Sequence, residues 1–390
     1  MDTMDTGASF DHQPRTRIVF GPGALDRLGE LARQLGATRA LLVTDQGIVA
    51  AGHTARAIAS LQNAKVEVVI FDKARENPTT QCVADCLALA SPASVNIIVG
   101  LGGGSSMDTA KGCNFLLTNG GRMQDYRGVG KASKPMLPMI AIPTTAGTGS
   151  ECQSAALIVD EQTHQKMACL DPKAAPRLAI LDPALTISQP ARVTACTGID
   201  ALAHALESAV TTKRNVISWM YSREAFRLCA TSFPQVLMNP QALEARGQML
   251  LGAALAGLAI ENSMLGAAHA AANPLTAHYG VVHGQAVGMM LPAVIRFNAT
   301  ELAAQKTYTD LAATIDSHSA NGMLAESLAQ RVEAMLALAQ LPTSLEQCGV
   351  ERGKLPLLAE EAAGQWTATF NPKPLKSEEF FALYEQAFDR

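Results

Sequence analysis

The sequence has 390 residues, of which 48% are hydrophobic and 17% are charged, and its formal net charge is −4. At roughly 100–200 residues per domain, this length predicts two domains that each bury a core of their own. Acidic and basic residues are interspersed, which argues against nucleic-acid or membrane-surface partners because neither would meet a basic stripe.

The first half of the chain alternates short apolar runs with segments of helical periodicity. Helical spacing occupies ranges such as 24–35 and 79–90. Alternation of this kind, with nearly continuous apolar strands, predicts a parallel sheet covered by helices on both faces, a Rossmann-like α/β domain. The predicted strands are 39–44, 66–71, 96–100, 139–142 and 178–181.

After Asp182-Pro183 the chain becomes rich in Ala and Leu, with helical periodicity and almost no β-branched runs. This change predicts an all-helical second domain, with the boundary within 186–192 and the domains at 1–188 and 189–390. The longest wholly apolar run, Met249 to Ile260, has 12 residues, against roughly 20 needed to span a bilayer. We therefore expect no membrane span.

The compartment is predicted from the N-terminus and the cysteines. The first five residues are acidic and lack the basic-then-apolar order of a signal peptide. The eight cysteines are scattered and form no zinc-ribbon spacing, which favours reduced thiols packed as small apolar side chains. We expect a cytoplasmic protein.

A cluster of glycines follows the strand predicted at 96–100. The run Leu101-Gly102-Gly103-Gly104-Ser105-Ser106 leads directly into a helical pattern. Strand, glycines and helix start in this order place free backbone N–H groups at a helix N-terminus, where the helix dipole favours an anion. Ser105 or Ser106 would cap the helix. The pattern predicts a phosphate-binding loop, and a tight turn without a ligand is the alternative.

A second loop, from Pro143 to Glu151, also follows an apolar strand. Its hydroxyl groups suit ribose and phosphate oxygens, although a polar turn is the alternative. Two such loops at the ends of parallel strands favour a dinucleotide over a mononucleotide. Neither loop matches G-x-G-x-x-G or G-x-x-x-x-G-K-[ST]. The four hydroxyl groups belong to Thr144, Thr145, Thr148 and Ser150.

The acidic residue suited to an adenosine ribose is Asp45. It ends the strand 39–44, ahead of the glycine cluster rather than about 20 residues after it. A carboxylate at that place would repel the 2′-phosphate of NADP, so the sequence favours NAD(H). The alternative for Asp45 is a turn-forming residue.

Three of the eight histidines, His269, His278 and His283, fall within a 15-residue window. A fourth, His204, follows Asp200 by four residues, so on a helix both side chains leave the same face. Their neighbours are apolar, and an unpaired carboxylate among them would be costly to bury. A divalent cation would neutralise the carboxylate and accept the lone pairs of the imidazoles.

The local patterns around two of these histidines differ. His269 lies in a segment predicted as a helix that stops at Pro274, whereas His283 is expected in a loop beside Gly284. A hydrogen-bonded core histidine is the alternative for any one of them, but the combination requires a common partner. One carboxylate and three imidazoles suit Fe(II) or Zn(II) better than Mg or Ca. The predicted ligands are Asp200, His204, His269 and His283.

Taken together, these motifs resemble those of the iron-containing (group III) alcohol dehydrogenases. The similarity extends to Phe20-Gly21-Pro22-Gly23 and to Asn371-Pro372-Lys373-Pro374, so it covers nearly the whole chain. It implies a fold like that of dehydroquinate synthase, with an N-terminal nucleotide-binding α/β domain and a C-terminal all-helical metal domain. It also implies a homodimer or a larger homo-oligomer. The motifs that carry it are 102–111, 143–151, 198–207 and the positions of His269 and His283.

The resemblance further implies that Asp45, Asn77, Lys166 and Leu185 lie along the cofactor. The other expected cofactor contacts come from the two loops: Gly102, Gly103, Gly104, Ser105, Asp108, Thr144, Thr145, Thr148 and Ser150. The chain departs from the family twice. Members often carry a histidine, credited with proton relay, four residues after the His269 position, and this chain has Asn273. Many have a histidine after the Leu-Pro at 291–292, and this chain has Ala293.

The expected reaction is hydride transfer between NAD(H) and a small alcohol or the corresponding aldehyde or ketone. The expected metal is Fe(II), and Zn(II) is the alternative. The metal would lower the pKa of the alcohol, and His278 is the candidate proton relay. Rival enzymes are a maleylacetate reductase, a glycerol or polyol dehydrogenase and a lyase of the dehydroquinate synthase type. A rival of a different class is a catalytically silent regulator that binds a nucleotide or a metal.

Overall fold

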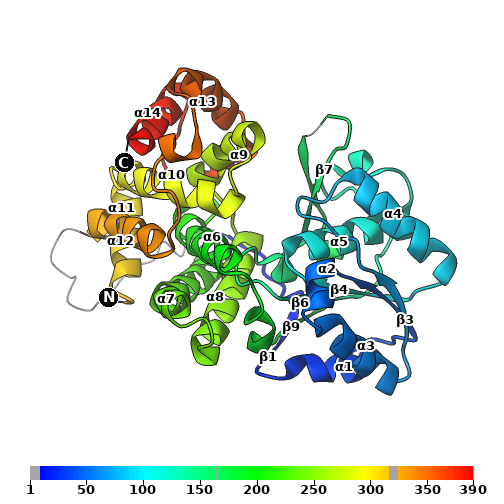
Figure 1. Ribbon diagram of the computed structural model, residues 1–390. Coiled ribbons are helices and arrows are strands. Elements are labelled where there is room, and N and C mark those ends of the chain that lie inside the picture. The colour runs from blue at the N-terminus through cyan, green and yellow to red at the C-terminus, as the bar shows by residue number, and fades with distance from the viewer. Residues whose placement is uncertain (1–8, 164, 316–323, 390) are drawn as a thin grey trace. The chain divides into compact units, whose positions relative to one another are not determined.

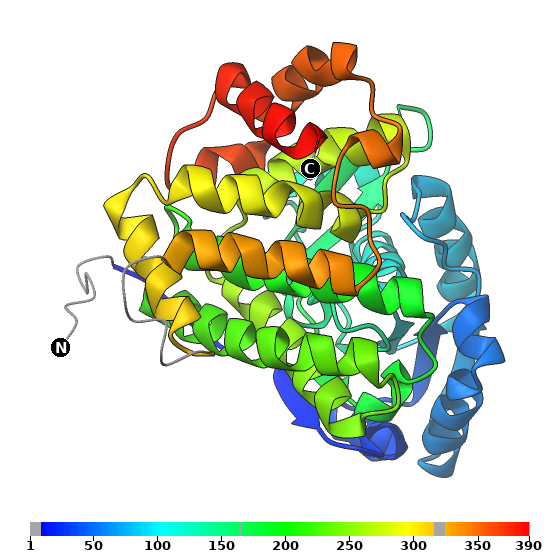
Figure 2. The ribbon, with the colours of Figure 1, turned by 60° about the vertical axis from the view of Figure 1, so that its left-hand side comes forward.

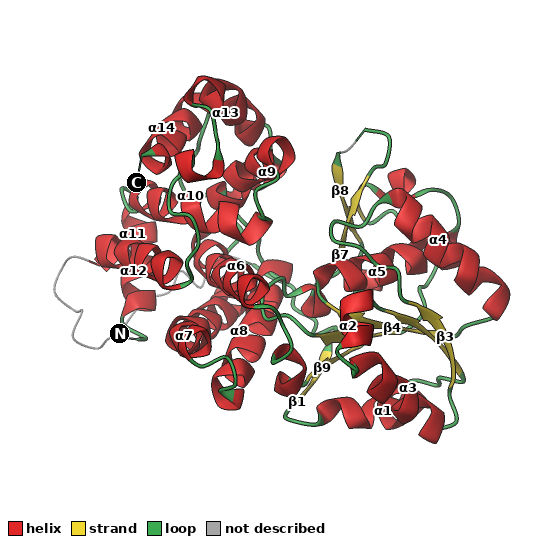
Figure 3. Ribbon diagram, viewed as in Figure 1, coloured by secondary structure: helices red, strands yellow, loops and turns green. Residues whose placement is uncertain are grey.

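The structure is a computed structural model that describes residues 9–163, 165–315 and 324–389. The chain divides into two units, Gln13–Gln189 and a second made of Pro190–Arg390 together with the segment up to His12. Figures 1 and 3 show strands and helices in the first unit and a helical second unit. The predicted fold class is thereby confirmed.

A six-stranded sheet forms the centre of the first unit, and all of its strands pair in parallel. The strands lie in the order β1-β9-β6-β4-β2-β3. Five of them are the predicted strands, whereas the edge strand β1 was not predicted. The bounds are β1 (Arg17–Phe20), β2 (Arg39–Val43), β3 (Glu67–Phe71), β4 (Ile97–Gly102), β6 (Met139–Pro143) and β9 (Leu178–Leu181).

Helices cover both faces of this sheet, because successive side chains of a strand point to opposite faces. Ala40 and Leu42 of β2 pack in one core with α1 and α3, whereas Leu41 and Val43 pack in another with α4 and α5. The helices of this unit are η1 (Ala24–Arg27), α1 (Leu28–Gln34), α2 (Gln46–Ala50), α3 (His53–Asn63), α4 (Thr80–Ala90), η2 (Ser91–Ala93), α5 (Gly104–Asn119), η3 (Met123–Tyr126), η4 (Ser150–Cys152), η5 (Pro172–Ala174) and η6 (Pro183–Thr186).

The strand order reverses beside β2. From β2 the chain moves outward to β3 and then returns to the other side of β2 as β4. The helices that follow β2 and β4 therefore lie on opposite faces of the sheet. Open α/β sheets bind their ligands at the carboxyl ends of strands where the order reverses in this way. Asp45 and the glycines at 102–104 follow these two strand ends.

A second, three-stranded sheet was not predicted. Its central strand β8 (Lys166–Leu170) pairs antiparallel with β7 (Ala155–Val159) and parallel with β5 (Gly128–Val129). Strand β7 packs against α5. Through β7, this sheet therefore connects the segment that follows the loop 143–151 to α5, the helix that begins at the glycines.

The second unit is built around α6, whose residues from Gly198 to Val210 are all buried. Helices α7 and α8 pack with it, and α10 joins it to α9, α12 and α14 (Figure 2). The bounds are α6 (Ala191–Val210), α7 (Val216–Met238), α8 (Leu243–Glu261), α9 (Ala267–Tyr279), α10 (His283–Asn298), α11 (Leu302–Ala312), α12 (Leu324–Leu338), η7 (Glu346–Cys348), η8 (Arg352–Lys354), α13 (Leu355–Ala363), η9 (Trp366–Phe370) and α14 (Ser377–Phe388).

Helix α8 is the one described helix that is long and apolar enough to cross a membrane, with a hydropathy of 1.2 over its most apolar window. Within the protein, 67% of that window is buried. Packing against α6 and α7 accounts for this apolar character, because a core helix needs apolar side chains on most of its surface.

Two local predictions in this unit are wrong. The helix that carries His269 does not stop at Pro274, because α9 continues to Tyr279. Proline costs a helix about 3 kcal/mol, since it lacks an N–H group, but the packing of α9 against α10 and α13 opposes that cost. His283 does not lie in a loop: it is the first residue of α10, where its backbone N–H needs no partner within the helix.

Candidate metal centre and nucleotide loops

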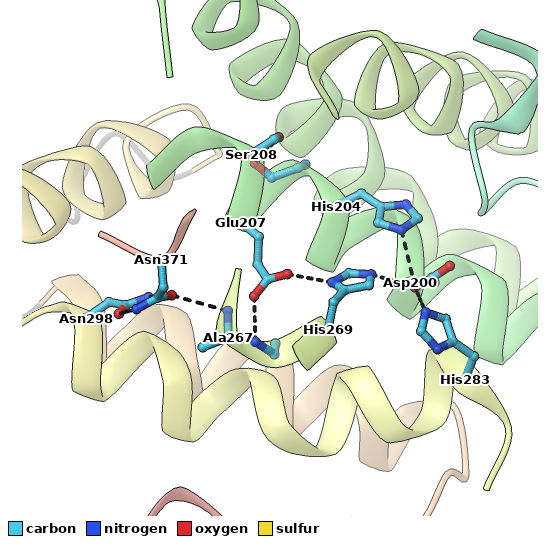
Figure 4. A network of polar contacts seen from close by, with 11 residues as sticks. Asp200, His204, Glu207, Ser208, Ala267, His269, His283, Asn298 and Asn371 are labelled. Carbon is cyan, nitrogen blue, oxygen red and sulfur yellow. Dashed lines mark hydrogen bonds and ion pairs between the residues drawn. The ribbon is translucent and has the colours of Figure 1, made fainter. Parts of the chain in front are cut away.

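Four side chains from three helices of the second unit converge on one point (Figure 4). Helix α6 carries Asp200 and His204 one turn apart, α9 carries His269 near its start, and α10 begins with His283. The structure brings the ligand atoms of Asp200, His269 and His283 within 4.8 Å of one another, and His204 lies beside them, next to Asp200. We call this set, Asp200, His204, His269 and His283, the metal cluster.

The distances from Asp200 to the three histidines are close to those between the ligands of one ion. The Oδ1 atom of Asp200 lies 3.5 Å from Nε2 of His204 and 3.5 Å from Nε2 of His269. It lies 4.0 Å from Nε2 of His283. Ligand atoms that are each about 2.1 Å from a tetrahedral ion are about 3.4 Å from one another. The distances therefore suit a shared ion better than direct hydrogen bonds.

Two atoms of the metal cluster are buried and have no hydrogen-bond partner, Oδ1 of Asp200 and Nε2 of His269. Leaving such atoms unpaired costs free energy, and a cation that binds both removes the cost. Imidazole and carboxylate together are donors that iron and zinc accept. The residues present therefore fit a divalent ion of this kind.

Neighbouring groups of opposite charge shift the pKa values of Asp200 and His269. Burial by itself raises the pKa of Asp200, but His204, His269 and His283 together hold that pKa well below its usual range. Burial lowers the pKa of His269, whereas Glu207 and Asp200 outweigh it and raise the pKa to about 9. A cation that binds Nε2 of His269 would therefore compete with a proton for the same lone pair.

Glu207 supports the metal cluster, although no role was assigned to it from the sequence. Its Oε2 atom lies 2.5 Å from Nδ1 of His269, and its Oε1 atom accepts the N–H of Ala268 at 2.6 Å. Because the carboxylate binds the Nδ1–H group, it leaves the lone pair of Nε2 for the ion. The sequence spacing could have indicated this role. Glu207 lies three residues after His204 and seven after Asp200, which places all three side chains on the same face of α6.

The backbone N–H groups at the start of α9 donate hydrogen bonds to side chains that lie far away in the sequence. Asn371 Oδ1 accepts the N–H of Ala267 at 3.3 Å, and Asn371 Nδ2 donates to Asn298 Oδ1 at 2.7 Å. A side chain at Gly266 would lie 3.0 Å from Asn371 Oδ1 and 3.2 Å from Glu207 Oε1, so a glycine permits this close approach. Asn371, the first residue of the Asn-Pro-Lys-Pro run, thus supports the start of the helix that carries His269.

His278 is not part of the metal cluster. Nine residues of continuous helix separate it from His269, which corresponds to a rise of about 13.5 Å, and its Nε2 atom lies 2.8 Å from the carboxylate of Glu361. Asn273, one turn after His269, donates from Nδ2 to Gln365 Oε1 at 3.0 Å. Ala293 is fully buried in α10.

In the first unit, the glycines lie at the junction of β4 and α5. Gly102 has φ +148°, a conformation that favours glycine. Helix α5 begins at Gly104, and its N-cap is Gly103 without a side-chain hydrogen bond, so the predicted cap by Ser105 or Ser106 is wrong. The Ser106 hydroxyl instead donates to Asp45 Oδ2 at 3.2 Å. No side-chain cap therefore competes with a ligand for this helix N-terminus.

The loop from Pro143 to Glu151, which we call the hydroxyl loop, lies against the glycines. A side chain at Gly104 would lie 2.9 Å from Cγ2 of Thr148, and one at Gly103 would lie 3.4 Å from Cγ2 of Thr145. Such contact explains why glycine is needed at 104. The two loops therefore form one surface at the carboxyl ends of β4 and β6.

Asp45 lies beside this surface and also has a structural role. Its side chain caps α2 by accepting the N–H of Ile48 at 3.0 Å, so its structural role is that of a helix N-cap. Its Oδ2 atom would lie 3.2 Å from a side chain at Gly102, which places the carboxylate next to the glycines. Lys166 Nζ lies 3.2 Å from Asn77 Oδ1, and Leu185 is buried in η6.

Two family models match the chain, "Iron-containing alcohol dehydrogenase" over residues 14–183 and "Fe-containing alcohol dehydrogenase family, C-terminal" over residues 194–388. The chain is 33% identical over 384 residues to the 1,3-propanediol dehydrogenase of Klebsiella pneumoniae, covering 97% of this chain and 99% of that protein. It is 33% identical over 361 residues to the NAD-dependent methanol dehydrogenase of Bacillus methanolicus, covering 91% and 93%. A crystal structure of 1,3-propanediol oxidoreductase matches with a TM-score of 0.93 at 33% identity, covering 98% and 100%.

Proposed function

This chain belongs to the iron-containing alcohol dehydrogenase family, and we propose that the metal cluster is its iron site and that the glycines and the hydroxyl loop form its NAD(H) site. The chain is an NAD(H)-dependent oxidoreductase that interconverts an alcohol and its aldehyde or ketone. One observation carries the assignment of the iron site: two buried atoms, Asp200 Oδ1 and His269 Nε2, face each other at 3.5 Å without a hydrogen-bond partner.

Iron, when bound, supplies Lewis acidity toward the oxygen of the alcohol or the aldehyde, and NAD(H) accepts or donates the hydride. The single carboxylate of Asp200, among three imidazoles, neutralises only half the charge of a divalent ion. The site therefore still attracts negative charge that develops on the substrate oxygen. Glu207 keeps His269 in the tautomer that presents Nε2, and it holds the start of α9 in place.

For the cofactor, the α5 N-terminus offers backbone N–H groups to the pyrophosphate, because no side chain caps it. Asp45 lies at the strand end next to β4, where the order of the sheet reverses, and would accept hydrogen bonds from the adenosine ribose. Its negative charge disfavours the 2′-phosphate of NADP. These features support NAD(H) as the cofactor of this chain.

The substrate is a short primary alcohol or diol, or the corresponding aldehyde. Support comes from the relatives, which are named for 1,3-propanediol and methanol. His278 is retained as the proposed proton relay, held by Glu361. Because about 13.5 Å of helix separate it from His269, water or a ribose hydroxyl would have to complete the path.

We further propose a cytoplasmic location and a homo-oligomeric assembly. All eight cysteines are free thiols, and seven of them are buried, as suits a protein of the reducing cytoplasm. Similarity to the family supports a homodimer or a larger homo-oligomer. Light scattering after size-exclusion chromatography would contradict this assembly if the mass were that of one 41.0 kDa chain.

The experiment that tests the function is metal exchange. The protein is purified anaerobically, stripped with a chelator and reloaded separately with Fe(II), Zn(II) or Mg(II). NAD-linked oxidation of a series of short alcohols and diols is then measured. We expect Fe(II) to restore the most activity and Mg(II) to restore none, because imidazole ligands do not suit Mg(II). Full turnover by stripped protein would overturn the proposal.

A further inference from the structure

Lys111 is the one lysine of the described chain among its largest fully buried side chains, with 0% of its surface exposed. It lies on α5, about two turns after Gly104. Its Nζ atom donates to Ser150 O at 2.7 Å and to Ser150 Oγ at 2.8 Å. It also donates to Gln153 O at 2.8 Å and to Ala155 O at 2.9 Å. All four acceptors belong to the end of the hydroxyl loop and the segment that leads into β7.

The partners of Lys111 explain its burial. An ammonium group is costly to bury unless its N–H groups meet acceptors. Here three N–H groups are shared among four oxygens, and three of these are backbone carbonyls between the start of η4 and the first residue of β7. Such carbonyls need partners of their own when they are buried. The lysine and these carbonyls therefore satisfy each other's hydrogen-bonding needs.

Ser150 is held by α5 a second time. Its hydroxyl accepts from Lys111 and donates to Asp108 Oδ1 at 3.1 Å. Asp108 lies three residues before Lys111 on the same face of α5. Burial raises the pKa of Asp108, and Lys111 opposes that rise. The Ser150 hydroxyl is thus used inside the protein, whereas the sequence led us to expect a contact with the cofactor.

This arrangement couples the two loops of the nucleotide site. The N-terminus of α5 carries the glycines, and the body of α5 holds the end of the hydroxyl loop through Lys111 and Asp108. Between these two points, Thr148 lies against Gly104. Helix α5 is therefore a common support for both loops, and Lys111 connects it to the second by two hydrogen bonds to Ser150.

We propose that Lys111 is a positioning residue that fixes the hydroxyl loop against the glycines and so preorganises the site for the pyrophosphate of NAD(H). The inference rests on the proposed nucleotide site. Lys111 acts through the loop, because its own donors are taken up by Ser150, Gln153 and Ala155. A site assembled in advance spends less binding free energy on ordering the loop when the cofactor binds.

The test is Lys111→Met, which keeps an unbranched side chain one atom shorter and removes the charge and the donors. Calorimetry measures the dissociation constants of NADH and ADP, and steady-state assays measure KM for NAD and kcat. We expect both ligands to bind about tenfold more weakly or worse, with KM raised more than kcat is lowered. Bound iron should stay at the wild-type level, because the metal cluster lies in the other unit.

Leu31→Ala is the matched control. Leu31 is buried in α1 on the opposite face of the sheet, so its loss should lower the melting temperature without changing the dissociation constant of ADP. Ser150→Ala removes one acceptor of Lys111 and should weaken ADP binding less than Lys111→Met. It also provides the readout if Lys111→Met does not fold.

The outcomes separate the two proposals. If wild-type protein binds ADP and NADH but Lys111→Met, or Ser150→Ala in its place, binds them equally well, the positioning role is wrong. A loss of affinity in Leu31→Ala as large as in Lys111→Met would also overturn it, because general destabilisation would then suffice. If wild-type protein itself binds neither ligand, the proposed nucleotide site fails first.

Discussion

Replacing Glu207 by Gln removes one acceptor and keeps the size of the side chain. In the wild type, both carboxylate oxygens accept, one from the N–H of Ala268 at 2.6 Å and the other from Nδ1–H of His269 at 2.5 Å. An amide has one acceptor, so its NH2 group must face one of these two positions. When the NH2 group faces His269, it binds Nδ1 as a donor and shifts the ring proton to Nε2, the atom that the ion needs.

The expected loss follows from this tautomer shift. Removal of such a supporting partner lowers metal affinity about 10–100-fold, or about 1.4–2.7 kcal/mol. The assay is anaerobic competition for Fe(II) against a chelator of known affinity, for the wild type and for Glu207→Gln. Ser208→Ala is the matched control, because Ser208 is the next residue on α6 and its hydroxyl bonds to that of Ser222 at 2.8 Å. Wild-type affinity in Glu207→Gln, or an equal loss in Ser208→Ala, would refute the reasoning.

Three further predictions concern cofactor choice, pH and proton transfer. Asp45→Asn should raise the ratio of kcat/KM for NADP to that for NAD about tenfold, because it removes the charge and keeps an N-cap; an unchanged ratio would leave Asp45 as a cap alone. Burial raises the pKa of Glu151 to about 7, so the folded state holds a proton that the unfolded state releases between pH 4.5 and 7, and folding stability falls as pH rises through this window. Glu151→Gln should therefore gain up to about 3 kcal/mol relative to wild type between pH 5 and pH 8, as measured by denaturant unfolding, and a gain independent of pH would contradict this. His278→Gln should retain iron and lower kcat/KM, because it removes the proposed proton relay, whereas a wild-type kcat/KM would exclude a relay through His278.

The sequence predicted the large sheet well, because its strands are buried on both faces and appear as continuous apolar runs. The edge strand β1 was missed, since its four residues include an exposed arginine and pair with one neighbour only. The three-stranded sheet was missed for two reasons. Strand β5 has only two residues. Strands β7 and β8, which pair with each other, each follow a segment rich in residues that form turns. Short strands of this kind are defined by their partners rather than by their own composition.

The ligands of the metal cluster were predictable because Asp200 and His204 share a helical face and three further histidines cluster in the sequence. The residues that hold these ligands in place were not predictable. The contacts of Glu207 lie 61 and 62 residues away, and those of Asn371 lie 73 and 104 residues away, so no local pattern exposes them. The end of the helix at Pro274 was predicted wrongly, because helix propensity does not account for the tertiary packing that stabilises α9.

The same limit applies to Lys111 and Ser150 in the first unit. The sequence placed Ser150 among hydroxyls that suit a cofactor, and it gave Lys111 no role of its own. Only the folded chain shows that the two residues bind each other across 39 positions. A polar residue beside a binding loop can serve either the ligand or the loop, and its hydrogen-bond partners decide between these roles.

The most direct test of the central claim is the iron content of anaerobically purified protein, measured by elemental analysis for the wild type, His269→Ala and His278→Ala. His269 supplies a buried atom that lacks a hydrogen-bond partner, whereas His278 lies on the same helix and bonds to Glu361. We expect stoichiometric iron in the wild type and in His278→Ala. We expect His269→Ala to lose iron and turnover and to retain NADH binding. Full iron content and full turnover in His269→Ala would show that the metal cluster is not the iron site.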